Sequence, residues 1–255
     1  MIHLRLLLFV LPFLSPLLSS AEPSAASHPV PVEERKAIRE TYSRAEKLNA
    51  ERIQADPKKV DAYSRRGDAR LFLGNFAGAA EDYEKMIRLD PSLDVSHWRL
   101  GIAYYYLNRF DKAAHQFEIY HNYDDVDREN GIWRFMSQTL NQNMETARKN
   151  LLKYKKTDRP PYPQLYALYA GEIGPEEVFA KIKAAEFTKA YEIRVRFHAD
   201  LYVGIHHELN GRNKEALRHL RAAAANGYGR ATGTYMWQVA RLHYDLFQKK
   251  HPQKP

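Results

Sequence analysis

The clearest pattern along the chain is a run of apolar positions at helical spacing between residues 61 and 91. Apolar or small side chains recur three and four positions apart in two blocks of about 13 residues, which predicts two amphipathic α-helices. Gly74 and Asn75 separate the blocks, and Asp90 with Pro91 follows the second. Glycine at a turn and proline past a helix end are typical boundary signals. The segment is therefore predicted to be a helix–turn–helix unit.

This unit repeats with a period of 34 residues, the distance from Gly67 to Gly101. A fixed period of this length is typical of a repeat protein. Small side chains where two helices cross, such as Gly67 and Gly101, let the helices approach closely, whereas larger side chains would hold them apart. Arg66 and Arg70 depart from the pattern, because apolar residues are expected there. The matched small and aromatic positions are Gly67 and Gly101, Ala79 and Ala113, and Tyr83 and Phe117.

Less regular units follow the first two repeats. The third has Phe135 at the position of the small glycine, so its helices are predicted to be more widely splayed. The segment from Thr234 to Gln248 is predicted to cap the last apolar face, which a solenoid requires. The predicted organisation is an N-terminal helix (33–59), repeats at 60–93 and 94–127, a degenerate repeat (128–161), a short helical pair (162–186), a repeat at 197–230, the cap (234–248) and a tail (249–255).

The period and its small residues resemble the tetratricopeptide repeat. This resemblance implies an all-α, right-handed superhelical solenoid of helix–turn–helix repeats with a C-terminal capping helix. The order of units, with a short pair rich in tyrosine (Tyr162, Tyr166, Tyr169), is similar to that of the NlpI family of bacterial envelope lipoproteins. That similarity implies a homodimeric adaptor outside the cytoplasmic membrane that docks proteases and cell-wall hydrolases. Those lipoproteins carry a cysteine after the signal sequence, but this chain has none, so we expect a soluble protein.

The first 21 residues have the layout of a signal peptide. Arg5 precedes an apolar stretch from Leu6 to Leu18, and small residues follow up to Ala21, where cleavage is expected. The stretch is shorter than the roughly 18 residues of a spanning helix, and no later segment could cross a bilayer. A buried N-terminal helix is the alternative. Residues 22–32 are predicted to be a flexible leader, and the chain is expected in the periplasm or outside the cell.

Composition and charge narrow the classes of function. A hydrophobic share of 44% is enough for a core and argues against wholesale disorder. The absence of cysteine excludes disulfides, thiol nucleophiles and cysteine-based metal sites. A formal charge of +8 could attract anionic glycans or lipid headgroups, whereas export argues against nucleic acid. We interpret the basic run from Lys149 to Arg159 as a solvated helix face near a C-terminus.

Motifs for catalysis or metal binding are absent. The chain has no G-x-S-x-G elbow, H-E-x-x-H helix or phosphate-binding loop. His206 and His207 are adjacent and so point about 100° apart on a helix, which favours structural roles. Asp124, Asp125 and Asp127 lack the glycine of a calcium loop and are interpreted as a turn that caps a helix. We therefore predict no catalytic residue, metal or cofactor. An enzyme would need a cleft of converging carboxylates or histidines.

The partner-binding residues are predicted from the tetratricopeptide register, which places the first helix of each repeat along a concave face. Aromatic residues in such a groove are typical interface hot spots. The alternative is that they pack against a neighbouring unit or in a dimer interface. The Tyr-rich segment 162–169 would then be the next candidate. The residues that the register assigns to the groove are Phe72, Trp98, Ile102, Tyr105 and Tyr106.

The predicted function is a non-enzymatic scaffold for protein–protein interactions in the bacterial cell envelope, recruiting cell-wall hydrolases or proteases. Repeats that clamp chaperone C-termini have Lys and Asn where this chain has Ser64 and Asp68, so that class of partner is disfavoured. A binder of anionic envelope polymer and an enzyme without a recognisable motif are the alternatives.

Overall fold

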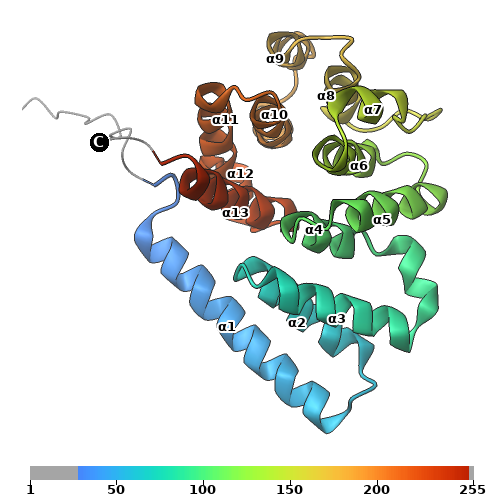
Figure 1. Cartoon of the computed structure of the whole chain (residues 1–255). Helices are drawn as coiled ribbons and strands as arrows, with labels where there is room; N and C mark the ends of the chain where they lie inside the picture. Colours follow the sequence, from blue (N-terminus) through green and yellow to red (C-terminus); the bar gives the residue numbers. More distant parts are fainter. Residues whose placement is uncertain (1–27, 253–255) are drawn as a thin grey trace, which may run out of the picture.

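The computed structural model describes residues 28–252, which form α-helices, one short 3₁₀ helix and no β-strand (Figure 1). The all-α fold class predicted from the sequence is therefore confirmed. The predicted signal peptide and the first part of the predicted leader lie outside the described residues. The elements are α1 (Val32–Ala55), α2 (Val60–Phe72), α3 (Phe76–Leu89), η1 (Pro91–Ser96), α4 (Trp98–Tyr106), α5 (Phe110–Tyr123), α6 (Arg128–Asn141), α7 (Met144–Lys149), α8 (Tyr162–Ala170), α9 (Pro175–Ala184), α10 (Lys189–Leu209), α11 (Asn213–Ala225), α12 (Gly227–Thr232) and α13 (Tyr235–Lys250).

Neighbouring helices pack in pairs that stack into a curved helical-repeat solenoid (Figure 1). The most extensive contacts join α10 with α11, α5 with α6, and α2 with α3. The middle of the chain is less regular, because α7 is only 6 residues long and a loop from residue 150 to 161 follows it. α2, α4, α6 and α10 form the inner face of the curve, and we call this surface the inner face.

Two glycines allow the close crossings that the sequence pattern predicts. A Cβ atom on Gly67 would lie 2.5 Å from Cε1 of Tyr83 on the facing helix α3. A Cβ atom on Gly101 would lie 2.7 Å from Cζ of Phe117 on α5. Both aromatic rings are fully buried, so they fill the space that the missing side chains leave. The first two repeats therefore each pair a glycine on the first helix with a large ring on the second.

The two arginines that depart from the repeat pattern form an ionic network inside the first repeat. Arg66 on α2 donates to both carboxylate oxygens of Asp82 on α3, at 2.6 and 3.0 Å. Arg70 donates to Asp82 at 3.1 Å and to Glu46 on α1 at 3.0 Å. Because Asp82 is only 2% exposed, its charge needs such partners. The network joins α1, α2 and α3 where apolar contacts would usually do so.

The two ends of the described chain meet. α1 begins beside α12 and α13, although these helices are far apart in the sequence (Figure 1). Val30 is fully buried, and His28 lies 2.7 Å from the carboxylate of Asp245 on α13. Glu34 on α1 pairs with Arg230 on α12 at 2.6 Å. These contacts hold the N-terminal helix against the last two helices.

Candidate functional site

The last helix, α13, packs mainly against α11 and also contacts helices of the inner face. Its first residue, Tyr235, packs edge-on against Trp98 on α4 and against Phe72 on α2, with ring centroids 4.7 Å apart in both cases. Further along α13, Arg241 donates to the backbone carbonyl of Phe72 at 2.6 Å. An amphipathic final helix must bury its apolar side, and the aromatic inner face is the surface next to it.

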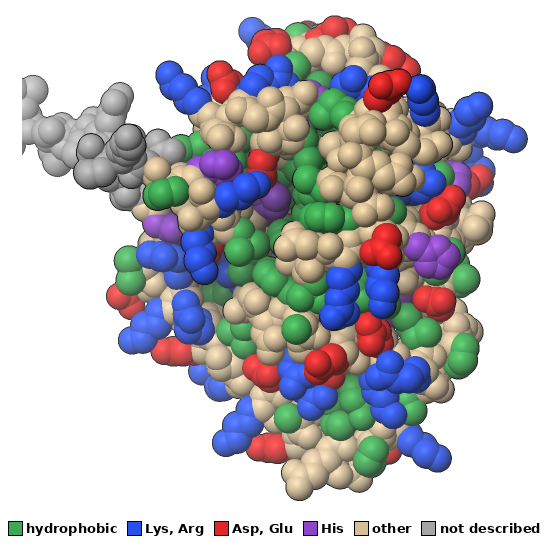
Figure 2. All heavy atoms as spheres, in the orientation of Figure 1, with side chains coloured by type: hydrophobic (Ala, Val, Ile, Leu, Met, Phe, Trp, Pro, Cys, Tyr) green, Lys and Arg blue, Asp and Glu red, His purple; other side chains and the backbone are tan. Residues whose placement is uncertain are grey.

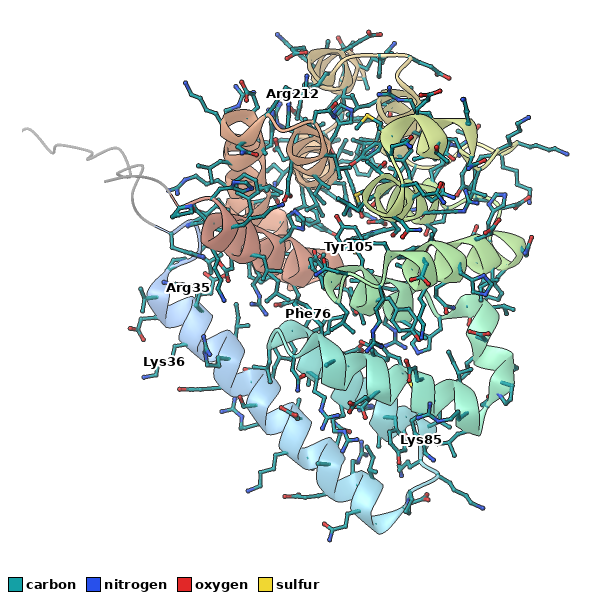
Figure 3. The ribbon with its side chains drawn as sticks, in the orientation of Figure 1. Arg35, Lys36, Phe76, Lys85, Tyr105 and Arg212 are labelled. Atoms are coloured by element: carbon teal, nitrogen blue, oxygen red, sulfur yellow. The ribbon has the colours of Figure 1, made fainter. Side chains whose placement is uncertain are left out.

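The remaining predicted groove residues are also largely covered. Tyr105 is only 7% exposed, and its ring meets that of Trp133 on α6 at 5.1 Å. Tyr106 stacks on Phe76 with ring centroids 4.8 Å apart, and Figure 3 shows Phe76 at the start of α3 below α4. Ile102 is fully buried. The structure thus brings the predicted residues together on one face, where they contact helices of the same chain.

Polar contacts fix the middle and end of α13 on α10. His243 lies 2.8 Å from the carboxylate of Glu208 and 3.1 Å from the hydroxyl of Tyr106. Lys250 pairs with the same Glu208 at 3.2 Å. Partial burial raises the pKa of Glu208, but the hydrogen bonds and charges of His243 and Lys250 outweigh this effect and lower the pKa to about 2. The helix is therefore held by ionic contacts as well as by aromatic packing.

The part of the inner face beside the start of α13 remains hollow. A cavity of about 310 Å³ lies among α4, α6, α10 and the α12–α13 junction, and we call it the inner cavity. Its size is at the lower end of that of small-molecule and side-chain pockets. Its walls combine aromatic rings with charged groups. The lining residues are Trp98, Asp127, Glu129, Asn130, Trp133, Arg159, Arg194, His198, Tyr228, Thr234, Tyr235 and Met236.

Three carboxylates surround one guanidinium group at the edge of this cavity. Arg159 lies 3.1 Å from Asp158, 3.4 Å from Glu129 and 3.8 Å from Asp127. Asp127 precedes α6 and accepts a hydrogen bond from the backbone N–H of Glu129 at 3.0 Å, so it caps that helix. The capping role predicted for this aspartate is confirmed. Three carboxyl groups therefore share one guanidinium group beside the cavity.

A chain of hydrogen bonds holds Glu129 from the other side. The hydroxyl of Tyr202 on α10 donates to Glu129, and the indole N–H of Trp133 donates to that hydroxyl at 3.0 Å. The hydroxyl of Tyr162 on α8 lies 2.8 Å from Nδ1 of His198. These contacts connect α6, α8 and α10 and fix the side chains in place. Charged groups held this way can recognise a ligand without reorganising.

Burial changes the protonation of the cavity groups. Burial and the neighbouring charge of Glu129 raise the pKa of Asp127 to about 7. Burial also raises the pKa of Glu129, against the hydroxyls of Tyr162 and Tyr202 and the charge of Arg159, which lower it. Burial and then Arg159 lower the pKa of His198 to about 3, so its ring is neutral at pH 7. Perturbed groups in a cavity are a recognised sign of a functional site.

The sequence interpretation missed most of this site. The basic run ending at Arg159 was expected on a helix face, but this expectation is wrong because α7 ends at Lys149. The following loop turns back so that Asp158 accepts a hydrogen bond from the backbone N–H of Arg128 at 2.9 Å. The Tyr-rich segment is not an open surface either, since Tyr162 and Tyr169 are fully buried. The signal that the sequence did offer was the pair of acidic residues Asp127 and Glu129 at the start of α6.

Chemically, the arrangement is suited to binding charged groups. Within residues 28–252, no set of three or more His, Asp or Glu side chains has the geometry to hold a metal ion. His206 and His207 are buried in the core, in agreement with the structural role predicted for them.

Comparison with known proteins agrees with the repeat geometry. Residues 60–93 match the family model of the tetratricopeptide repeat. The chain contains a tetratricopeptide repeat. It is 31% identical to Hsp70-Hsp90 organizing protein 3 of Arabidopsis thaliana over 38% of this chain and 18% of that protein. It is 27% identical to the Hsp70-Hsp90 organizing protein of Triticum aestivum over 49% of this chain and 22% of that protein.

The similarity also reaches a lipoprotein. The chain is 24% identical to a Lipoprotein NlpI homolog of Haemophilus influenzae over 54% of this chain and 43% of that protein. The chain therefore spans less than half of the length of each of these relatives. The tetratricopeptide repeat supports a scaffold for protein–protein interactions as the class of function.

Proposed function

We propose that this chain is a non-enzymatic adaptor that binds protein partners in the bacterial cell envelope, where it recruits cell-wall hydrolases or proteases. The observation that carries the proposal is a tetratricopeptide scaffold with a charged, aromatic-walled cavity on its inner face. Its likeness to a Lipoprotein NlpI homolog supports the envelope location. No helix within residues 28–252 has the length and apolarity needed to cross a bilayer. Export by the predicted signal peptide and assembly as a homodimer belong to the same proposal.

The surface favours proteins over polyanions as partners. Figure 2 shows Lys and Arg side chains interspersed with Asp and Glu over the visible face. Several of these charges are paired at i, i+4 spacing, as Lys149 is with Glu145 at 2.7 Å and Lys181 with Glu177 at 3.3 Å. A binder of anionic polymer is expected to gather its cations into one patch.

Affinity capture tests the adaptor role. The chain without residues 1–21 is immobilised and incubated with an envelope extract from the organism that carries it, at low and at high salt. Contacts that bury apolar surface survive high salt, whereas binding to a polyanion is screened. We expect one or a few proteins to remain bound at high salt in stoichiometric amounts. If all capture is lost at high salt and the low-salt eluate contains glycan, the adaptor hypothesis is refuted and the chain is a binder of anionic polymer.

A further inference from the structure

We propose that the inner cavity receives the basic side chain, arginine or lysine, of a protein partner. This inference rests on the proposed adaptor function and specifies which group of the partner is recognised. The cavity is large enough for a single side chain, at about 310 Å³, and it opens on the inner face beside α13. It would therefore read one residue of a partner segment that lies along this face.

The balance of charge selects a cation. Asp127, Glu129 and Asp158 share the single guanidinium of Arg159. The side chains of these carboxylates are 21%, 12% and 2% exposed, so solvent screens them little. Above pH 7, where Asp127 is mainly ionised, these three carboxylates outnumber the two guanidinium groups of Arg159 and Arg194, so a positive group that enters the cavity meets a net negative charge at short range. A guanidinium group of the partner would pair with carboxylates that Arg159 alone cannot neutralise.

The opposing positive group lies at the rim. Arg194 on α10 is exposed, and its guanidinium lies over the ring of Tyr228, 5.8 Å from the centroid. It makes no ion pair with any residue in the range 28–252. Solvent screens an exposed charge much more than a buried one, so Arg194 opposes an entering cation only weakly. Arg159 also lines the cavity, but three carboxyl groups already surround its charge, and the ring of His198 is neutral at pH 7.

The aromatic walls favour the same ligand. Trp98 and Tyr235 pack edge-on with ring centroids 4.7 Å apart, and Trp133 also lines the cavity. Guanidinium and ammonium groups are attracted to the faces of such rings, and tryptophan is the strongest partner. Thr234 also lines the cavity, and its hydroxyl oxygen is buried without a hydrogen-bond partner in the described part of the chain. A donor on the ligand would satisfy it.

Binding of small probes tests this cavity directly. Nα-acetyl-arginine amide and Nα-acetyl-lysine amide are titrated into the protein without residues 1–21, with Nα-acetyl-citrulline amide as the neutral control of matched shape. Two of the three tryptophans line the cavity, so their fluorescence reports occupancy. We expect saturable binding of the two cations with Kd on the order of a millimolar, typical of fragments this small, and at least about tenfold weaker binding of citrulline. Equal binding of the neutral control, or no saturation by roughly 20 mM cation, overturns the proposal.

Two substitutions identify the sign of the recognised charge. Asp127→Asn removes the charge but keeps an oxygen that can cap α6, since asparagine caps as well as aspartate. At pH 8, where Asp127 is mainly ionised, we expect this variant to bind the cations about five- to tenfold more weakly. Arg194→Gln should bind them about twofold or more tightly, because it removes the only opposing charge at the rim. Tighter cation binding by Asp127→Asn, or weaker binding by Arg194→Gln, overturns the proposal.

A matched control separates this result from general charge effects. Glu145 on α7 is 78% exposed and remote from the cavity, so Glu145→Gln should leave cation binding unchanged. An equal loss in Glu145→Gln and Asp127→Asn contradicts a specific cavity. The adaptor function is judged separately by envelope capture. Retained capture together with absent fragment binding refutes the cavity assignment alone, whereas failed capture refutes the adaptor.

Discussion

Replacing Gly67 by alanine adds one methyl group at the crossing of α2 and α3. The new Cβ would lie 2.5 Å from Cε1 and 2.9 Å from Cδ1 of Tyr83. Contacts below 3.0 Å require one of the groups to move. Tyr83 has little freedom to move, because its ring is fully buried and its hydroxyl donates to Asp68 at 2.7 Å. The two helices must therefore separate or the ring must leave its rotamer.

Two opposing effects set how much the free energy of unfolding changes in Gly67→Ala. Overpacking of this kind typically costs about 1–3 kcal/mol. Alanine in place of glycine inside a helix recovers about 0.5–1 kcal/mol. We expect a net decrease of about 1–2 kcal/mol in the free energy of unfolding, which lowers Tm by about 2–8 °C in a protein of this size.

Thermal melts followed by circular dichroism, together with urea unfolding, measure this change. Gly227→Ala is the matched control, because a Cβ at that position of α12 meets nothing within 4 Å. The control should keep its Tm or gain slightly. If Gly67→Ala melts at or above the wild-type temperature, then the crossing is not packed as tightly as described, and the repeat register is wrong.

Four further predictions address acid stability, the ionic network, α13 and export. Burial lowers the pKa of His97 to about 3 and those of His206 and His207 to about 4, from 6.5. Because the unfolded chain binds protons at these histidines more readily, the free energy of unfolding is highest above pH 6.5 and falls as the pH drops towards 4, by about 1.4 kcal/mol per pH unit for each histidine. Urea unfolding at several pH values measures this decrease, and a free energy that does not change with pH would contradict their burial. Asp82→Ala leaves two arginines without their shared carboxylate and should lower the free energy of unfolding by about 2–4 kcal/mol in urea melts, and a loss below about 0.5 kcal/mol would show that water replaces it. Ending the chain after Gly233 removes α13, which should increase binding of the dye ANS through the uncovered aromatic rings, whereas unchanged dye fluorescence would mean that α13 is not their cover. Mass spectrometry of the exported protein should find Glu22 as its first residue, and an intact Met1 would rule out the signal peptide.

The sequence by itself determined the repeated helix pairs. Their contacts depend on residues at a constant spacing, such as Gly67 with Tyr83 and Gly101 with Phe117, and a period in the chain makes this spacing visible. The sequence also showed that Arg66 and Arg70 stand where the repeat pattern expects apolar residues, but it did not show that Asp82 is their partner. Any acidic residue on the facing helix could have served, and only the rotation of that helix selects one.

Only the tertiary structure decided how the inner face is filled. The path of α13 depends on how far the solenoid curves, which the sum of many small angles between helices sets. That curvature brings Tyr235 onto Trp98 and His243 onto Glu208, pairs that no spacing in the sequence relates. The inner cavity has the same origin, since its carboxylates, its arginine and its rings come from separate units. A repeat pattern describes contacts between successive helices, whereas closure of the solenoid on itself joins residues more than 100 positions apart, as Tyr106 with His243.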